Sequence, residues 1–217
     1  MFHQNTHIKT IYFSNDFDTK NIKHISSMFF YCTKLTSIDM FNFNTQSVVY
    51  MNDLFSGCKS LQNINISNFN TINTKYIYSM FKGCSSLTNI DLSMFDTKNV
   101  THMNSMFQYC TKLTSIDISN FNTEKVRSMS YLFDGCSELN SVKLGNFNTK
   151  KVQYMINIFN RCKKLKYIDI SNFSNEACSS FYNFSSYLPE NGDIKVKKSF
   201  YESIKKYIPE KWNVIFS

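Results

Sequence analysis

Glycine and proline are scarce in this chain, at 5 and 2 of 217 residues. So little glycine leaves no phosphate-binding loop of the G-x-x-x-x-G-K-[ST] or G-x-G-x-x-G kind. No apolar run reaches the roughly 18 residues of a membrane-spanning helix, so no such segment is expected. The first seven residues, MFHQNTH, lack the apolar core of a secretory signal, and no signal peptide is visible. The first cysteine is Cys32, which is too late for a lipoprotein anchor.

Charge is also sparse and unevenly distributed. Charged residues make up 18% of the chain and hydrophobic residues 42%, which is the composition of a folding chain. The net charge is +8, and residues 143–217 contribute +7 of it with 13 basic and 6 acidic residues. This asymmetry is consistent with a contact surface for an acidic partner or with a solvated lysine-rich end.

The sequence repeats itself with a period of 26 residues and no insertion. Equivalent positions hold the same residue type through six or seven successive units, which is typical of a solenoid. The five columns are Phe17, Phe43, Phe69, Phe95, Phe121, Phe147 and Phe173; Thr19, Thr45, Thr71, Thr97, Thr123 and Thr149; Phe29, Phe55, Phe81, Phe107, Phe133 and Phe159; Cys32, Cys58, Cys84, Cys110, Cys136 and Cys162; and Leu35, Leu61, Leu87, Leu113, Leu139 and Leu165.

One unit, residues 95–120, shows how each coil is expected to fold. Thr97 is a good helix N-cap, and the apolar residues from Val100 to Cys110 fall on one face of a short helix. The following L-T-S-I-D-I segment has the leucine-rich-repeat pattern that ends in a short strand. The sequence therefore predicts an α/β leucine-rich-repeat solenoid with one short parallel strand and one short helix per 26-residue coil. The Phe, Cys, Leu and Ile columns should be buried.

The position before each cysteine is Tyr31, Gly57, Gly83, Tyr109, Gly135 or Arg161. Glycine often ends a helix in the left-handed conformation. Because tyrosine and arginine also occur here, we expect that a left-handed conformation is not compulsory.

The chain divides into a single domain with degenerate caps. We expect an N-terminal cap strand in residues 1–16, six regular repeats in 17–172, a degenerate seventh repeat in 173–198 and a C-terminal cap in 199–217. The cap should contain a helix near 199–207 and a strand near 212–216, with Trp212 covering the last core layer.

The unit FDTKNVTHMNSMFQYCTKLTSIDISN resembles those of the BspA-like leucine-rich-repeat surface proteins. The resemblance covers about residues 17–196, and the M-F-x-x-C-x-x-L-x-x-I-D-L-S core carries it. It implies a surface or secreted protein that binds other macromolecules, and it brings no catalytic residues. A cytoplasmic location is the alternative, since no export signal is visible.

The cysteines and histidines are the first candidates for chemistry. Six cysteines share one inward column, which favours buried free thiols over disulfides between coils or a metal site. His24 and His102 share a column on the outer helix face, where Gln108 is also expected to be exposed. No nucleophile accompanies the histidines, so we expect no enzyme and no cofactor.

Two surfaces are candidates for partner binding. The outward strand positions should form a concave face, although an ordinary polar sheet face has the same pattern. Its C-terminal half interrupts the regular columns with a lysine and a tyrosine, and basic residues lie nearby. The candidate face comprises Asp39, Asn65, Asp91, Asp117, Lys143, Tyr167 and Asp169, and the candidate basic patch comprises Lys150, Lys151, Arg161, Lys163, Lys164 and Lys166.

The sequence therefore favours a monomeric, non-enzymatic module that binds a protein or another cell-surface macromolecule. The alternative is an intracellular scaffold or effector on the same solenoid. A nucleic-acid partner is disfavoured, because the basic cluster spans barely one coil.

Overall fold

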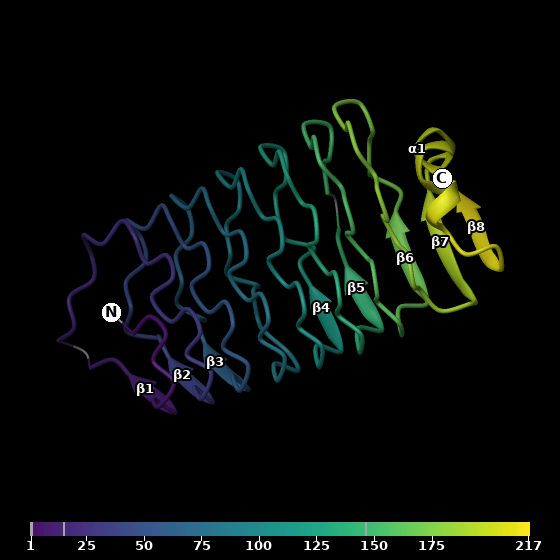
Figure 1. Ribbon diagram of the computed structural model, residues 1–217. Helices are drawn as coiled ribbons and strands as arrows, with labels where there is room; N and C mark the ends of the chain where they lie inside the picture. The colour runs from purple at the N-terminus through teal and green to yellow at the C-terminus, as the bar shows by residue number, and fades with distance from the viewer. Residues whose placement is uncertain (1, 15, 146) are drawn as a thin grey trace.

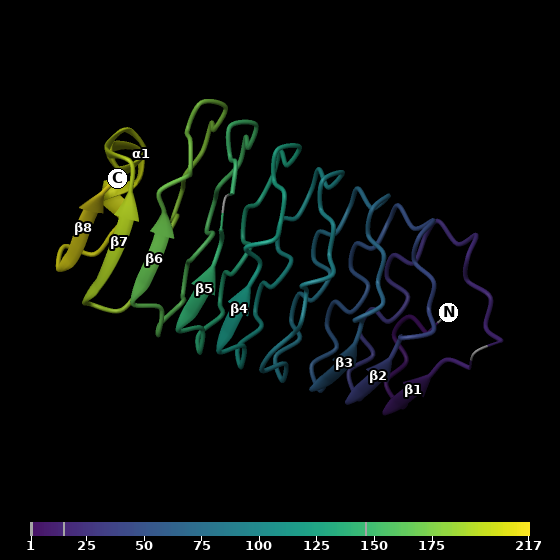
Figure 2. The same ribbon diagram turned by 180° about the vertical axis from the view of Figure 1, so that it is seen from behind.

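The computed structural model describes residues 2–14, 16–145 and 147–217. The chain winds into a solenoid whose coils stack in sequence order, with the N-terminus at one end and the C-terminus at the other (Figure 1). The view from behind shows the same succession of coils, with the strands along one side (Figure 2). The predicted solenoid is confirmed.

Short parallel strands form one side of the solenoid. Adjacent strands of the regular repeats pair in register at a shift of 26 residues, as with Ser37 and Asn63 or Ser115 and Ser141. In the described part of the chain, the strands form three sheets, in the orders β1-β2-β3, β4-β5 and β6-β7-β8. They are β1 (Thr10–Tyr12), β2 (Ser37–Asp39), β3 (Asn63–Asn65), β4 (Ser115–Asp117), β5 (Ser141–Lys143), β6 (Tyr167–Ile170), β7 (Gly192–Val196) and β8 (Trp212–Phe216).

The expectation of a strand in every coil is wrong for one coil. Residues 89–91 lie where a strand would join β3 to β4, but they have no strand conformation. The strand side therefore lacks continuous backbone pairing at this coil, and Figure 1 shows the gap between the β3 and β4 arrows.

The expectation of a helix in each coil is also wrong. On the side opposite the strands, alternate amides donate to the next coil rather than along their own segment. The N–H groups of Met103, Ser105 and Phe107 donate to the carbonyls 25 residues later, at 2.8–3.2 Å. The intervening amides close tight turns, as those of Met106 and Gln108 donate to the carbonyls of Met103 and Ser105 at 3.4 and 3.1 Å. A helix would need these groups for bonds four residues apart, so the outer segment is a ladder of turns.

Two residues of each outer segment adopt the left-handed conformation, which overturns the expectation for the column before cysteine. Tyr31, Tyr109 and Arg161 have φ values of 55°, 59° and 61°, close to those of the glycines in this column. At Gly57 and Gly135, the ring of the tyrosine one coil earlier lies over the glycine. A Cβ on Gly135 would meet the Tyr109 ring at 2.4 Å.

The core is built from the repeated columns, and the predicted burial is confirmed for the Phe, Cys and Leu columns apart from Phe17, whereas Ile64 and Ile90 of the Ile column are only partly buried. Phe69, Phe95 and Phe121 are 2–3% exposed, and the Leu and Cys columns are fully buried. The rings of the second Phe column stack from Phe29 to Phe159 with centroid spacings of 5.3–5.8 Å. Each coil therefore supplies one layer of a continuous hydrophobic core. Phe17, at the N-terminal end, is only partly buried because fewer layers cover it.

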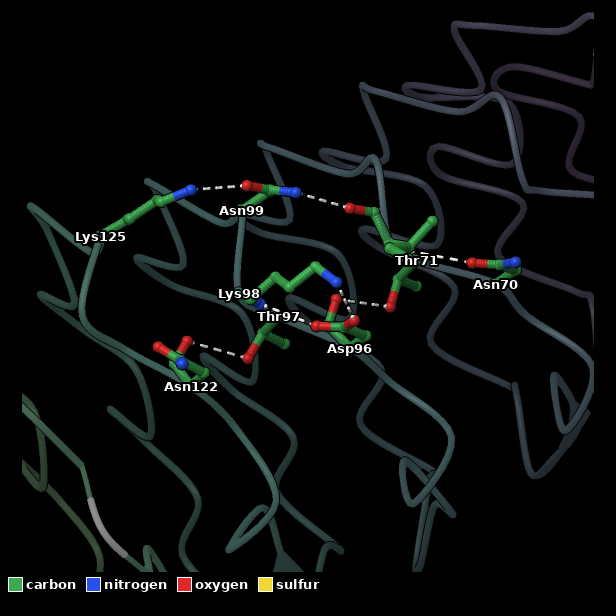
Figure 3. Close-up of polar contacts among 9 residues, drawn as sticks. Asn70, Thr71, Asp96, Thr97, Lys98, Asn99, Asn122 and Lys125 are labelled. Atoms are coloured by element: carbon green, nitrogen blue, oxygen red, sulfur yellow. Dashed lines mark hydrogen bonds and ion pairs between the residues drawn. The ribbon is translucent and has the colours of Figure 1, made fainter.

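The threonine column binds adjacent coils to each other instead of capping helices. The hydroxyl of Thr97 donates to the carbonyl of Asn122 at 3.0 Å, and that of Thr71 donates to Asp96 at 2.9 Å. Figure 3 shows these contacts beside a second bridge, in which Lys125 donates to the Asn99 side chain at 2.7 Å. The threonines are buried because they satisfy backbone groups between coils.

The C-terminal cap contains the helix and the strand that the sequence predicts. Helix α1 (Lys198–Ile204) continues into the 3-10 turn η1 (Lys205–Tyr207), and β8 then closes the last sheet. Trp212 is 5% exposed, and its indole N–H donates to the carbonyl of Pro189 at 2.8 Å. The only tryptophan thus covers the final core layer, as expected.

Candidate functional site

The outward side chains of the strands form a polar surface, which we call the strand face. Parallel pairing at a 26-residue shift aligns them in columns. The pairing extends the predicted columns at both ends, because Tyr12 pairs with Asp39 and Lys195 pairs with Asp169. The candidate strand-face residues thus lie in two adjacent columns, with Tyr167 in one and the others in the second.

The aspartates of the strand face stabilise the turns that directly follow them. Asp39, Asp91, Asp117 and Asp169 each accept the backbone N–H of the residue two positions later, at 2.9–3.1 Å. Such turns are a common structural role for aspartate. The row of carboxylates is therefore explained by local structure and does not define a cation site.

Charge pairs between neighbouring coils further neutralise this face. Lys143 lies 3.1 Å from Asp117, and Lys195 lies 3.4 Å from Asp169. The pKa of Asp117 falls to about 2 because the hydroxyl and N–H of Ser119 donate to its carboxylate and Lys143 lies beside it. Asp117 is thus charged at neutral pH, and its exposed pair with Lys143 contributes little to stability.

Two exposed tyrosines lie on the strand face, one on its first strand and one on β6. Tyr167 is 47% exposed on β6, and Tyr12 is 74% exposed on β1. Tyr167 was predicted from the sequence but Tyr12 was not, because the strand that carries Tyr12 is shifted by one residue from the regular phase. The 26-residue comparison therefore did not align Tyr12 with Asp39.

A shallow groove of about 360 Å³ lies near the N-terminal end of this face. Tyr12 borders it, and its walls come from β2, β3 and residues 89–91. The groove coincides with the coil that lacks a strand. It lies away from the C-terminal half that the sequence favoured.

The candidate basic residues lie in two different segments of the coil. Lys150 and Lys151 belong to the turn after Phe147, and Lys150 lies 3.9 Å from Glu176. The residues from Arg161 to Lys166 connect the outer segment to β6 instead. Lys164 pairs there with Glu138 at 2.5 Å, so acidic neighbours neutralise part of the positive charge in both places.

The outer face also holds a buried carboxylate that the sequence analysis missed. Asp134 is 1% exposed and accepts hydrogen bonds from Gln108 at 2.8 Å and Asn160 at 2.7 Å. Gln108 is itself buried, which corrects the expectation that it is exposed. His102 is half-buried and contacts the ring of Tyr76. The amide side chains one coil before and after Asp134 explain how the carboxylate is accommodated.

The thiols of the cysteine column donate hydrogen bonds within the core. The Cys110 thiol donates to the Phe81 carbonyl at 3.1 Å, and the other regular repeats make the same contact. Burial raises the pKa of the Cys110 thiol to about 12. Because the thiolate is the reactive form, these groups should be poor nucleophiles.

We predict slow labelling of Cys58, Cys84, Cys110 and Cys136 in the native protein and fast labelling in denaturant. Cys84→Ala should lower the free energy of unfolding by about 1–3 kcal/mol, since it leaves a small cavity. Labelling followed by mass spectrometry checks the first expectation, and urea unfolding checks the second. Native labelling at the denatured rate, or a mass decrease from disulfides, would contradict them. Half-buried Cys178 is the internal comparison.

These features define a parallel β-solenoid with leucine-rich-repeat sequence units. The chain belongs to the family described as "Mycoplasma protein of unknown function, DUF285", whose model matches residues 1–116 and 87–196. The search of curated proteins gives no match.

Among solved structures, the chain is similar to the leucine-rich-repeat protein of T. pallidum (TpLRR). The identity is 17% and the TM-score is 0.47, over 97% of this chain and 81% of the other.

The described part of the chain shows neither of two further features. No group of three or more His, Cys, Asp or Glu side chains there is arranged to hold a metal ion. None of its helices is long and apolar enough to cross a bilayer.

Proposed function

We propose that this protein is a non-enzymatic binding module whose strand face contacts another protein. The observation that carries the proposal is the strand face itself, where stacked coils present a strip of short polar side chains with exposed Tyr12 and Tyr167. Tyrosine is enriched among residues that dominate binding energy. Solenoids commonly use such extended surfaces for recognition.

The charge distribution supports an acidic partner. The chain carries a net charge of +8, most of it beyond residue 142. Basic side chains near Tyr167 would accelerate encounter with an acidic protein and make the association sensitive to salt. The resemblance to BspA-like proteins further supports a role in adhesion at the cell surface. An intracellular scaffold is the alternative, and protease treatment of intact cells distinguishes the two.

We predict that Tyr167→Ala combined with Lys143→Ser weakens binding of the partner. The purified protein would first be used to capture and identify that partner, and its affinity would then be measured. Loss of the tyrosine anchor and the lysine should raise the dissociation constant about tenfold or more. Stability should fall by no more than about 1 kcal/mol, since both side chains are on the surface.

The control variant combines Tyr182→Ala with Lys59→Ser, which removes the same residue types at positions away from the strand face, in the outer segment and in the turn that follows it. Tyr182 is 62% exposed and Lys59 is also exposed. This variant replaces a test at His102 and Gln108, because Gln108 supports buried Asp134. If the control variant lowers the affinity and the strand-face variant leaves it unchanged, the binding surface would be assigned to the outer face.

A further inference from the structure

A row of stacked aromatic rings runs along the outer face, and we call it the ring ladder. It occupies one repeat column, in which each residue forms a parallel bridge with its equivalent in the next coil. The ring of Tyr50 lies between His24, at 4.3 Å, and Tyr76, at 5.0 Å, and His102 follows at 5.5 Å. Because the planes of neighbouring rings are nearly parallel, the spacing between adjacent coils accommodates one stacked ring per coil.

Ser128 interrupts the ring ladder. It takes the next position after His102, and Tyr154 takes the one after that. His102 and Tyr154 are therefore two coil steps apart, on the order of 10 Å. His24 and Tyr76 are separated by the same two steps, and the ring of Tyr50 fills the space between them.

An open pocket of about 450 Å³ lies at this interruption. Its lining includes Thr101, His102, Arg127, Ser128, Gln153 and Tyr154. Tyr154 is 47% exposed, and among the described residues neither it nor His102 has a ring partner on the side of Ser128. The pocket thus leaves the faces of two aromatic rings available to a ligand.

The walls are held in position before any ligand arrives. The Thr101 hydroxyl lies 2.9 Å from Nδ1 of His102, which fixes the orientation of the imidazole. Burial and nearby Arg127 lower the pKa of His102, so the ring is neutral at pH 7 and presents an uncharged aromatic face. Preorganised walls reduce the entropy that a ligand must lose on binding.

The charge at the rim selects the kind of ligand. Arg127 is exposed, and its guanidinium forms no hydrogen bond or ion pair with the residues that the structure describes. The net charge of +8 disfavours a second copy of this chain and favours an acidic partner. A guanidinium beside an aromatic pocket suits an aromatic side chain that has a carboxylate next to it in sequence.

We infer that the gap at Ser128 receives an aromatic side chain from an acidic segment of a partner protein, stacked between His102 and Tyr154. The inference rests on the proposed function as a protein-binding module, but it assigns a second contact on the outer face. The inserted ring would complete the ladder as Tyr50 does between His24 and Tyr76. An adjacent carboxylate would pair with Arg127.

The probe for this site is the peptide N-acetyl-Asp-Tyr-Glu-amide, and its leucine counterpart is the reference. Binding is followed by NMR through the ring protons of His102, which a stacked phenol shifts upfield. We expect a saturable shift with a dissociation constant on the order of 1 mM, as suits one anchor residue. The leucine peptide should produce no saturable shift.

Three variants locate the binding. Ser128→Tyr fills the gap with a ring of the chain's own and should weaken peptide binding about tenfold or more. Tyr154→Ser removes one wall and should do the same, which tests the site even if Ser128→Tyr fails to fold. Ser180→Tyr is the matched control, because it adds the same ring in the same column on the other side of Tyr154. It should leave the affinity within about twofold of the wild type.

Several outcomes would overturn the assignment. These are equal shifts with the leucine peptide, unchanged affinity in both Ser128→Tyr and Tyr154→Ser, and tighter binding of adenosine monophosphate at the same protons. The last result would identify a nucleotide site. If the captured partner depends on Lys143 and Tyr167 while the peptide does not bind, the proposed function stands and the outer-face inference fails.

Discussion

Phe107→Ala should destabilise the protein by about 3–5 kcal/mol, the usual effect of removing a fully buried aromatic side chain. Its ring stacks between Phe81 at 5.8 Å and Phe133 at 5.7 Å, so its loss opens a cavity against two further coils. Small domains have a total stability of about 5–15 kcal/mol, so the change should remove a large part of it. Urea unfolding measures the effect.

Phe41→Ala is the matched comparison, because Phe41 is 50% exposed in the turn after β2. It should change the free energy of unfolding by no more than about 0.5 kcal/mol. A loss below about 1 kcal/mol for Phe107→Ala would mean that the core is not the continuous stack of Phe layers described above.

Deletion of residues 95–120 should give a shorter protein that still folds. The deletion removes one 26-residue coil with β4 and joins Met94 to Phe121, so every later residue keeps its place in the repeat. The coils on either side can pack against each other, because each contacts mainly its neighbours. The variant should be soluble and should unfold cooperatively in urea.

Deletion of residues 95–107 should abolish folding. It removes half a unit and shifts all later residues out of phase, so that buried columns such as Cys110 and Leu113 no longer stack on Cys84 and Leu87. Circular dichroism and urea unfolding compare the two deletions. The modular account would be contradicted if both deletions folded equally well, or if neither folded.

The solenoid and its register could be predicted because a 26-residue period determines which residues stack. Phe95 must lie near Phe69 and Phe121 in any structure that keeps the repeat, and the ring spacings of 6.3 Å show this. The columns of the candidate strand face follow from the same register. Their alignment therefore needed no knowledge of the local backbone conformation.

The conformation of the outer segment could not be predicted in the same way. Val100, Met103, Phe107 and Cys110 follow helical spacing, but a series of turns closed by hydrogen bonds between residues three positions apart also directs them inward. The hydrogen bonds between coils and the left-handed conformation of Ser105 favour the turns over the helix. These two features arise only when coils stack. Asn and Ser within the segment disfavour a helix, but the apolar spacing, which favours one, was the stronger pattern in the sequence.

The candidate site was only partly accessible from the sequence. The aspartate column could be identified, but its role in the turns and the pairing of Lys143 with Asp117 depend on side-chain geometry. The interruption of the ring ladder at Ser128 could have been found by following the column of His24 and His102 through Tyr50, Tyr76 and Tyr154. Attention to histidine alone concealed the stacked tyrosines.

The most direct test of the proposed function is the affinity of the captured partner for two paired variants of equal stability. The strand-face assignment predicts that Tyr167→Ala with Lys143→Ser raises the dissociation constant about tenfold, whereas Tyr182→Ala with Lys59→Ser leaves it unchanged. An unchanged dissociation constant in the first variant and a raised one in the second would contradict the strand-face assignment.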